Sequence, residues 1–339
     1  MLKNRIFTGG DRYLVVLVAF TVLIIFFLGI TLGCTIFNQR TITSMMLQVA
    51  EFGVIAIAMS MCVLIGAIDL SIVTNANLAG IIAAKLMTGA WFPVDKMSTG
   101  LIMAMGIFAI MSVTILCGLI NGILIAKVSI NPIVATLATM TLYQGIAMAI
   151  SVGKIVSGFP TQYTALGVME AGPFPVLFLI MVTVMLCIAW ILANTPFGKK
   201  MYLIGENSVA ARFSGIENEK VIISVYVVVG VLAGIAAILI TARANSAKVG
   251  YGSSYVLQAM LVAVLGGFNP SGGRGKIIGI ALAIMCIQML QTAFTIWQFT
   301  PYTNKLIWGA MLIAVMLSEK ALNRYQVRKM EKESMHQSI

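Results

Sequence analysis

The side chains that could do chemistry in this sequence are few, and most stand among apolar neighbours. The stretch LIGAIDLSIV, residues 64–73, holds Asp69 and Ser71, and a second carboxylate, Glu51, lies inside another apolar run. An ionised carboxylate in apolar surroundings is costly unless it has a partner or a task. Candidates for a pathway, or for hydrogen bonds between helices, are Glu51, Asp69, Ser71, Thr74, Asn75, Asn77, Asn121, Asn131, Thr136, Thr139, Gln144, Gln288 and Gln291.

Enzymatic schemes find little support in these residue types. The only histidine is His336, near the C-terminus, which removes Ser-His, Cys-His and HExxH arrangements. No two carboxylates are spaced as an acid and base pair. The five cysteines are scattered without metal or redox spacing and are interpreted as packing residues. Transport without chemistry on the substrate is the expected function.

A glycine-rich stretch, LGGFNPSGGRGK at residues 265–276, raises the question of phosphate binding. The Walker A pattern fails because Lys276 is followed by Ile277, and the dinucleotide pattern G-x-G-x-x-G is missed by one residue. What remains is a segment whose backbone can turn tightly and approach other helices closely. Two interpretations stay open, a structural turn and a mobile gate.

The elements that must position these residues are membrane helices. The chain has 339 residues, 60% hydrophobic and 10% charged, with a mean hydropathy of +1.01, whereas soluble domains carry about 25% charged residues. We expect one all-α transmembrane domain over residues 1–339, a polytopic helix bundle within 13–318. About ten spans are predicted at 13–36, 43–65, 72–88, 99–126, 131–152, 173–194, 221–242, 255–268, 277–296 and 303–318.

Two of these regions are predicted to be broken or re-entrant, because the eighth span is short and the second joins the third with hardly any turn. Small-xxx-small pairs at Gly118/Gly122 and Gly230/Gly234 predict close helix packing. The net charge of +11 does not indicate nucleic acid, since the charges lie in loops rather than on a basic face.

The distribution of basic residues predicts the orientation. With ten spans and the N-terminus inside, 15 of the 22 Lys and Arg residues are cytoplasmic and the other 7 are outside. The positive-inside rule therefore favours an N-in and C-in topology. The tail at 319–339 is then a basic cytoplasmic extension, either solvated or in contact with anionic lipid headgroups.

A polar island at residues 195–220 is the largest cytoplasmic connection. It predicts a short helix over 205–216, with Asn207 or Ser208 as its N-cap and Gly215 as its stop. Such a helix packs either on another protein or on the bilayer surface. A protein partner is favoured because the apolar face is small, with only Val209, Phe213 and Ile216.

Four stretches together resemble the permease subunits of ABC importers for ribose, xylose, galactose, autoinducer and related sugars. They are GAIDLSIV (66–73), NGILIAKVSINPIVATLATM (121–140), IGENSVAARFSGI (204–216) and LGGFNPSGGRG (265–275), in the family's order and spacing. The first motif departs from the family's G-G-I-D-L-S-V-G, because Ala67 and Val73 replace two glycines, and this is expected to stiffen the turn. The last motif is intact.

The resemblance implies partners and residue roles. Such permeases work in the bacterial inner membrane with a second permease copy or sibling, a cytoplasmic ATP-binding subunit and a periplasmic or extracellular sugar-binding protein. No cofactor is expected on this chain, and ATP and Mg belong to the ATPase. The resemblance and the island predict ATPase-coupling residues Gly205, Glu206, Asn207, Ala210, Ala211, Arg212, Gly215 and Ile216. A translocation path or gate is predicted at Asp69, Ser71, Asn75, Asn121, Thr136, Gly266, Gly267, Gly272 and Gly273.

Competing hypotheses stay open from the sequence. A secondary ion-coupled carrier would use Asp69 or Glu51 for proton or sodium coupling, and a non-transporting membrane scaffold would need neither. For Asp69 itself, a structural role is favoured, in which the carboxylate caps the free amides of the third helix. A role along the sugar path is the main alternative.

Overall fold

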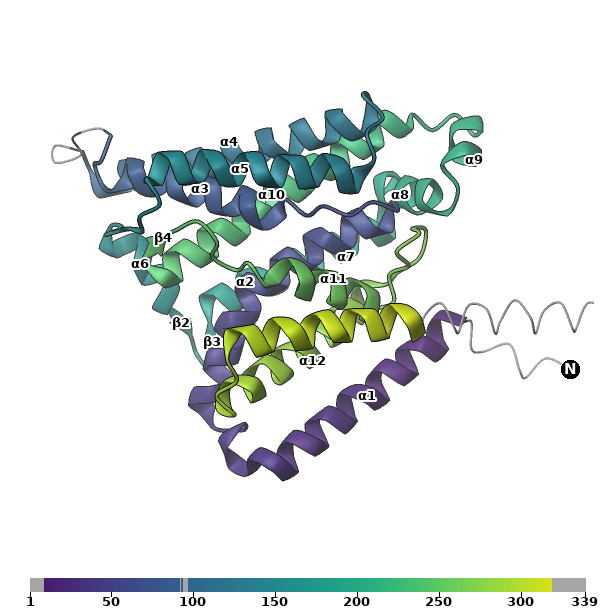
Figure 1. Cartoon of the computed structure of the whole chain (residues 1–339), viewed down its shortest axis with the longest axis horizontal. Coiled ribbons are helices and arrows are strands. Elements are labelled where there is room, and N and C mark those ends of the chain that lie inside the picture. Colours follow the sequence, from purple (N-terminus) through teal and green to yellow (C-terminus); the bar gives the residue numbers. More distant parts are fainter. Residues whose placement is uncertain (1–8, 92, 94–96, 319–339) are drawn as a thin grey trace, which may run out of the picture.

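Ten helices form the bundle in a computed structural model that describes residues 9–91, 93 and 97–318 (Figure 1). Each of the ten predicted spans coincides with one of them, with bounds that differ by a few residues. They are α1 (Gly9–Leu32), α2 (Gln39–Leu64), α3 (Ile72–Met87), α4 (Thr99–Ala126), α5 (Pro132–Ser151), α7 (Val176–Asn194), α10 (Asn218–Ala244), α11 (Tyr255–Leu265), α12 (Ile277–Ile296) and the helical residues 301–318. The predicted tail at 319–339 lies outside the described residues.

Six of these helices are long and apolar enough to cross a membrane, namely α2, α4, α5, α7, α10 and α12. The chain is thus a multi-pass helical membrane protein. The 11 residues of α11 extend about 16 Å at 1.5 Å per residue, about half of a 30 Å hydrocarbon core. The structure confirms that this helix is short, and its description as a broken or re-entrant span stays a prediction.

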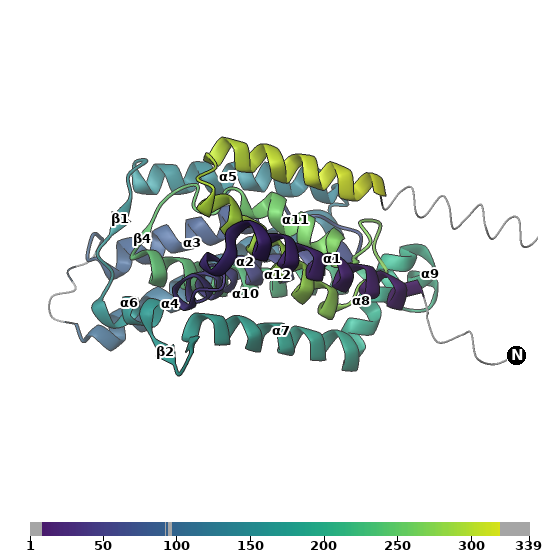
Figure 2. The same cartoon turned by 90° about the horizontal axis from the view of Figure 1, so that it is seen from below.

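Short elements lie at the two ends of the bundle. At one end are α6 (Thr161–Val168) and the two-residue strands β1 (Val156–Ser157) and β4 (Ser246–Ala247), which pair antiparallel, as do β2 (Glu170–Ala171) and β3 (Phe174–Pro175). A 3-10 turn, η1 (Gly33–Thr35), follows α1. At the opposite end lie α8 (Pro196–Glu206) and α9 (Ser208–Phe213), together with the start of α1 and the end of residues 301–318 (Figures 1 and 2).

The two halves of the bundle repeat the same order of elements in opposite directions. Helices α1 to α5 correspond to α7, α10, α11, α12 and residues 301–318, and each helix of the second half runs opposite to its counterpart. In both halves a long helix is followed by an irregular segment with left-handed glycines, Gly66 in one and Gly250 in the other, and then by a short helix. Across the halves, α3 packs on α10 and α11 packs on α2. This is an inverted repeat of the kind found in many transporters.

Glycines allow the central helices to approach closely. A Cβ atom on Gly230 would lie 2.5 Å from the carbonyl oxygen of Thr114, and one on Gly122 would lie 3.0 Å from the Cα of Ile223. Such distances leave no room for a side chain, so α4 and α10 meet backbone to backbone. The small-xxx-small prediction is confirmed for this pair of helices.

Candidate coupling and translocation site

Asp69 lies in the irregular segment between α2 and α3 and is 2% exposed. Its Oδ1 accepts hydrogen bonds from the backbone N–H of Ser71 at 2.8 Å and from the Ser71 hydroxyl at 2.7 Å. The carboxylate therefore fixes the residue that precedes α3. The prediction that it caps the free amides of the helix itself was wrong in detail, because both bonds end at Ser71, one residue before the first turn.

Side chains of α4 and the start of α5 hold this segment in place. Asn121 donates to the Ser71 hydroxyl at 2.8 Å, and the Thr136 hydroxyl lies 3.2 Å from the carbonyl oxygen of Ile68. Asn75, one turn into α3, donates to the carbonyl of Thr114 at 3.1 Å. The structure thus brings together five residues that the sequence predicted for the path, Asp69, Ser71, Asn75, Asn121 and Thr136.

The glycine-rich loop at 266–275 packs against the end of α2. The N–H of Gly273 donates to the carbonyl of Leu64 at 2.9 Å. A Cβ atom on Gly66 would lie 3.1 Å from the carbonyl oxygen of Ser271. Gly272 and Gly273 have φ of +90° and +78°, which L side chains rarely adopt. In this structure the loop is a tightly packed turn, and a role as a gate stays a prediction.

Helix α8 joins this contact at the end of the bundle (Figure 1). A Cβ atom on Gly205 would overlap the carbonyl oxygen of Leu64 and the nitrogen of Gly273, so three backbones meet here. The Tyr202 hydroxyl donates to the carbonyl of Gly275 at 2.9 Å, and burial raises the pKa of Tyr202, which keeps that proton in place. We call this meeting of Leu64, Gly205 and Gly273 the glycine junction.

The short helix predicted within 205–216 is present as α9 (Ser208–Phe213), but it is shorter than that range. Gly205 and Glu206 end α8, and Asn207 separates it from α9. The signal for α8 was present in the sequence, since Thr195 is followed by Pro196. A threonine N-cap followed by proline marks a helix start, and the Thr195 hydroxyl does accept from the N–H of Gly198.

Helix α9 has the caps that its sequence predicted. Asn207 Oδ1 accepts from the N–H groups of Val209 and Ala210, both at 3.0 Å, and Gly215 follows with φ of +81°. Phe213 is 90% exposed and Val209 is 62% exposed. The apolar face of α9 therefore points away from the chain.

Replacing Asn207 by alanine is expected to loosen α9. Loss of an N-cap costs about 1 kcal/mol, so amide hydrogen exchange over 208–213 should accelerate about fivefold. Asn194→Ala is the control, because Asn194 is also exposed but its side chain bonds only to the carbonyl of Trp190 in its own helix. Equal exchange rates in both variants would contradict the capping role.

A buried ion pair joins α2 to α10. Arg243 Nη1 lies 3.0 Å from Glu51 Oε1, Glu51 is 6% exposed, and the Tyr255 hydroxyl lies 3.4 Å from its other oxygen. The sequence predicts Arg243 outside the membrane and does not indicate that it pairs with Glu51. Nothing in the local pattern indicates a contact between residues 192 positions apart.

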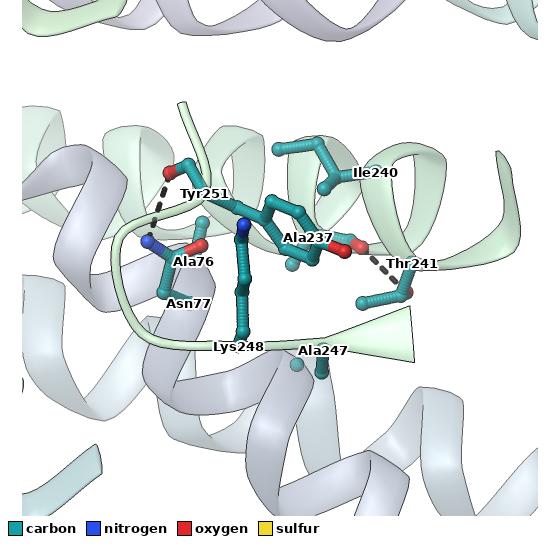
Figure 3. A pocket seen from close by; sticks show the side chains of 9 residues that line it. Ala76, Asn77, Ala237, Ile240, Thr241, Ala247, Lys248 and Tyr251 are labelled. Carbon is teal, nitrogen blue, oxygen red and sulfur yellow. Dashed lines mark hydrogen bonds between the residues drawn. The ribbon is translucent and has the colours of Figure 1, made fainter. Parts of the chain in front are cut away.

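Towards the other end of the bundle, a small pocket lies between α3, α10 and the segment after β4 (Figure 3). Of its polar lining, Asn77 was among the polar residues that the sequence indicated, whereas Lys248 and Tyr251 were missed. The Lys248 ammonium lies 4.6 Å from the centre of the Tyr251 ring, Asn77 donates to the Tyr251 carbonyl at 2.9 Å, and the Tyr251 hydroxyl bonds to Ser246 at 2.6 Å. The remaining walls are Ala76, Gly80, Ala237, Ile240, Thr241 and Ala247.

This combination defines a class of protein. Among the described residues no group of three or more His, Cys, Asp or Glu side chains could hold a metal ion. The polar groups instead lie on and between the helices of a multi-pass bundle, around two irregular segments that precede short helices, an arrangement found in membrane transport proteins.

Comparison with known proteins identifies the family. Residues 41–316 match the model described as "branched-chain amino acid transport system / permease component", and the chain belongs to this family. It is 32% identical to the ribose import permease protein RbsC of Bacillus subtilis over 82% of this chain and 84% of that protein. It is 31% identical to the autoinducer 2 import system permease protein LsrD of Klebsiella pneumoniae over 81% of this chain and 82% of that protein. No solved structure matches the chain.

The chain is thus the permease subunit of an ABC importer and not an enzyme, since ATP hydrolysis in this family belongs to a separate ATPase. Permeases of this family work with ATPase and binding-protein partners.

Proposed function

We propose that this permease imports a sugar or a sugar-like small molecule across a bacterial inner membrane by alternating access. Its relatives include proteins named for ribose and autoinducer-2 import. The complex comprises a second copy of this chain or a sibling permease, an ATP-binding subunit and a sugar-binding protein. ATP and Mg²⁺ bind the ATPase subunit.

The proposed topology has ten spans with both termini in the cytoplasm. It is supported by the ten helices of the bundle, whose directions alternate along the chain, and by the described chain starting and finishing at the end that carries α8 and α9 (Figures 1 and 2). That end also carries the Lys199, Lys200 and Arg212 side chains. The other end, with α6 and the paired strands, faces the binding protein.

The glycine junction is the observation that carries the proposed mechanism. The ATPase binds the exposed face of α9, and closure of the ATPase moves α8. Because Gly205 touches both Leu64 and Gly273, that movement reaches the end of α2 and the Asp69 segment directly. The bundle then changes between inward-open and outward-open states. Asp69, Ser71, Asn75, Asn121 and Thr136 lie near the inner end of the path, where cargo must bind weakly enough to leave.

Phe213→Asp is expected to release the ATPase. Its 90% exposed ring supplies most of the apolar contact that α9 offers, and apolar anchors dominate binding at such interfaces. Co-purification of the ATP-binding subunit with tagged permease should fall at least about tenfold, which corresponds to 1.4 kcal/mol.

The matched control is Phe174→Asp, the same change at an exposed phenylalanine of β3 near the other end of the bundle. It should leave co-purification unchanged. Retention of the ATPase by both variants would show that α9 is not the docking helix.

A further inference from the structure

The bundle contains two buried carboxylates, and only one of them has a basic partner. Glu51 is neutralised by Arg243 at 3.0 Å. Asp69 is more deeply buried, at 2% exposure, yet across residues 9–91, 93 and 97–318 no Lys or Arg nitrogen lies within 4.0 Å of it. Its hydrogen bonds come only from neutral groups, namely the N–H and O–H of Ser71 and the side-chain amide of Asn121. A buried charge without a counter-charge is strongly disfavoured.

Three further polar atoms in this region have no hydrogen-bond partner in the described part of the chain. They are Asn75 Oδ1, Asn121 Oδ1 and the hydroxyl of Tyr226, and their residues are 3%, 1% and 0% exposed. The side-chain nitrogen of Asn75 donates its hydrogen bond to the carbonyl oxygen of Thr114, which can only accept. The side-chain oxygen of Asn75 is therefore the atom that lacks a partner. Unpaired buried polar atoms call for a partner.

The three groups surround the Asp69 segment. Asn121 donates to the same Ser71 hydroxyl that donates to Asp69, so the two side chains are one hydroxyl apart. Asn75 follows Ser71 by one helical turn on the face of α3 that meets α4. Tyr226 of α10 packs against α4 at Gly122, the residue after Asn121, where a Cβ atom on Gly122 would lie 3.2 Å from the Tyr226 Cβ.

We propose that Asp69, Asn75 and Asn121 bind a resident monovalent metal cation of the sodium type. A carboxylate with amide oxygens is the donor set that hard cations prefer, and irregular segments between broken helices bind sodium in other transporters. One carboxylate balances one positive charge, which favours a monovalent ion. The ion stabilises the segment that joins α2 to α3 and stays in place while cargo passes. It is not the driving ion of transport.

The test is thermal unfolding of the purified full-length permease at constant ionic strength in sodium, potassium or choline chloride. Sodium is expected to raise the melting temperature by several degrees relative to choline, with saturation, because an ion that binds only the folded state stabilises it. Asp69→Asn should abolish the rise. Glu51→Gln, at the carboxylate that already has Arg243, should keep the sodium-dependent rise whatever its absolute melting temperature.

If Asp69→Asn does not fold, Asn75→Ala provides the test. This variant removes the proposed ligand oxygen of Asn75 and keeps the Asp69 carboxylate. The half-saturating sodium concentration should then rise about tenfold. Identical melting in sodium, potassium and choline would overturn the proposal in favour of a protonated Asp69 without a bound cation. An equal sodium effect in wild type and Asp69→Asn or Asn75→Ala would overturn it as well.

The proposed function fails by a different measurement. Uptake by the isolated chain in liposomes, driven by an imposed sodium gradient without ATP, would contradict the importer mechanism. The sodium dependence of the melting temperature tests the cation site separately, because that measurement does not depend on uptake.

Discussion

Gly205→Leu is expected to uncouple ATP hydrolysis from uptake. The new side chain has no space between the carbonyl of Leu64 and the nitrogen of Gly273, so α8 must move away from the end of α2. Coupling free energies between sites are about 1–3 kcal/mol, or about 5- to 150-fold, and uptake should fall within that range. The measurement is ATP-driven uptake into proteoliposomes that contain the full complex, together with the rate of ATP hydrolysis.

Gly100→Leu is the control for membrane insertion and bulk. Gly100 lies in the first turn of α4 with no atom near the place of its Cβ, and its replacement should leave uptake close to wild type. In Gly205→Leu, ATP hydrolysis should continue without stimulation by loaded binding protein. Normal uptake in that variant would exclude the glycine junction as the route of coupling.

Arg243→Met is expected to be the most destabilising single change at the ion pair. It leaves Glu51 charged and buried between α2 and α10, and removal of one partner from a buried pair costs about 3–5 kcal/mol. The melting temperature of the purified permease should fall accordingly.

The double variant Glu51→Met with Arg243→Met removes both charges and should recover most of the lost stability, because well-packed apolar residues can replace a buried ion pair at little cost. A double variant no more stable than Arg243→Met alone would show that the pair does not act as a unit. The Tyr255 hydroxyl, 3.4 Å from Glu51, is the remaining polar group at that position.

The helices could be predicted from the sequence because long apolar runs in a membrane satisfy their backbone hydrogen bonds only as helices or closed barrels. The cap at Asn207 and the stop at Gly215 were also readable, since both are local signals. Helix α8 was missed although Thr195 and Pro196 marked its start, because the surrounding residues are polar and were treated as a connection.

Contacts between distant parts of the chain could not be predicted. Leu64, Gly205 and Gly273 come from three separate motifs, and nothing in their spacing shows that their backbones touch. Arg243 is predicted outside the membrane because it directly follows the predicted span at 221–242 in the N-in topology. Its carboxylate partner, 192 positions away, holds it inside.

Helix α3 connects the two irregular segments of the inverted repeat. Its first turn is tied to α4 through Asn75 and through the Ser71 hydroxyl, and two residues after Asn75, Asn77 is tied to the carbonyl of Tyr251. Because α3 is a short helix, a movement of its bonds to α4 also moves its bond to Tyr251. A displacement of the segment before α3 therefore also displaces the segment before α11, although Asn77 and Tyr251 are 174 positions apart in the sequence.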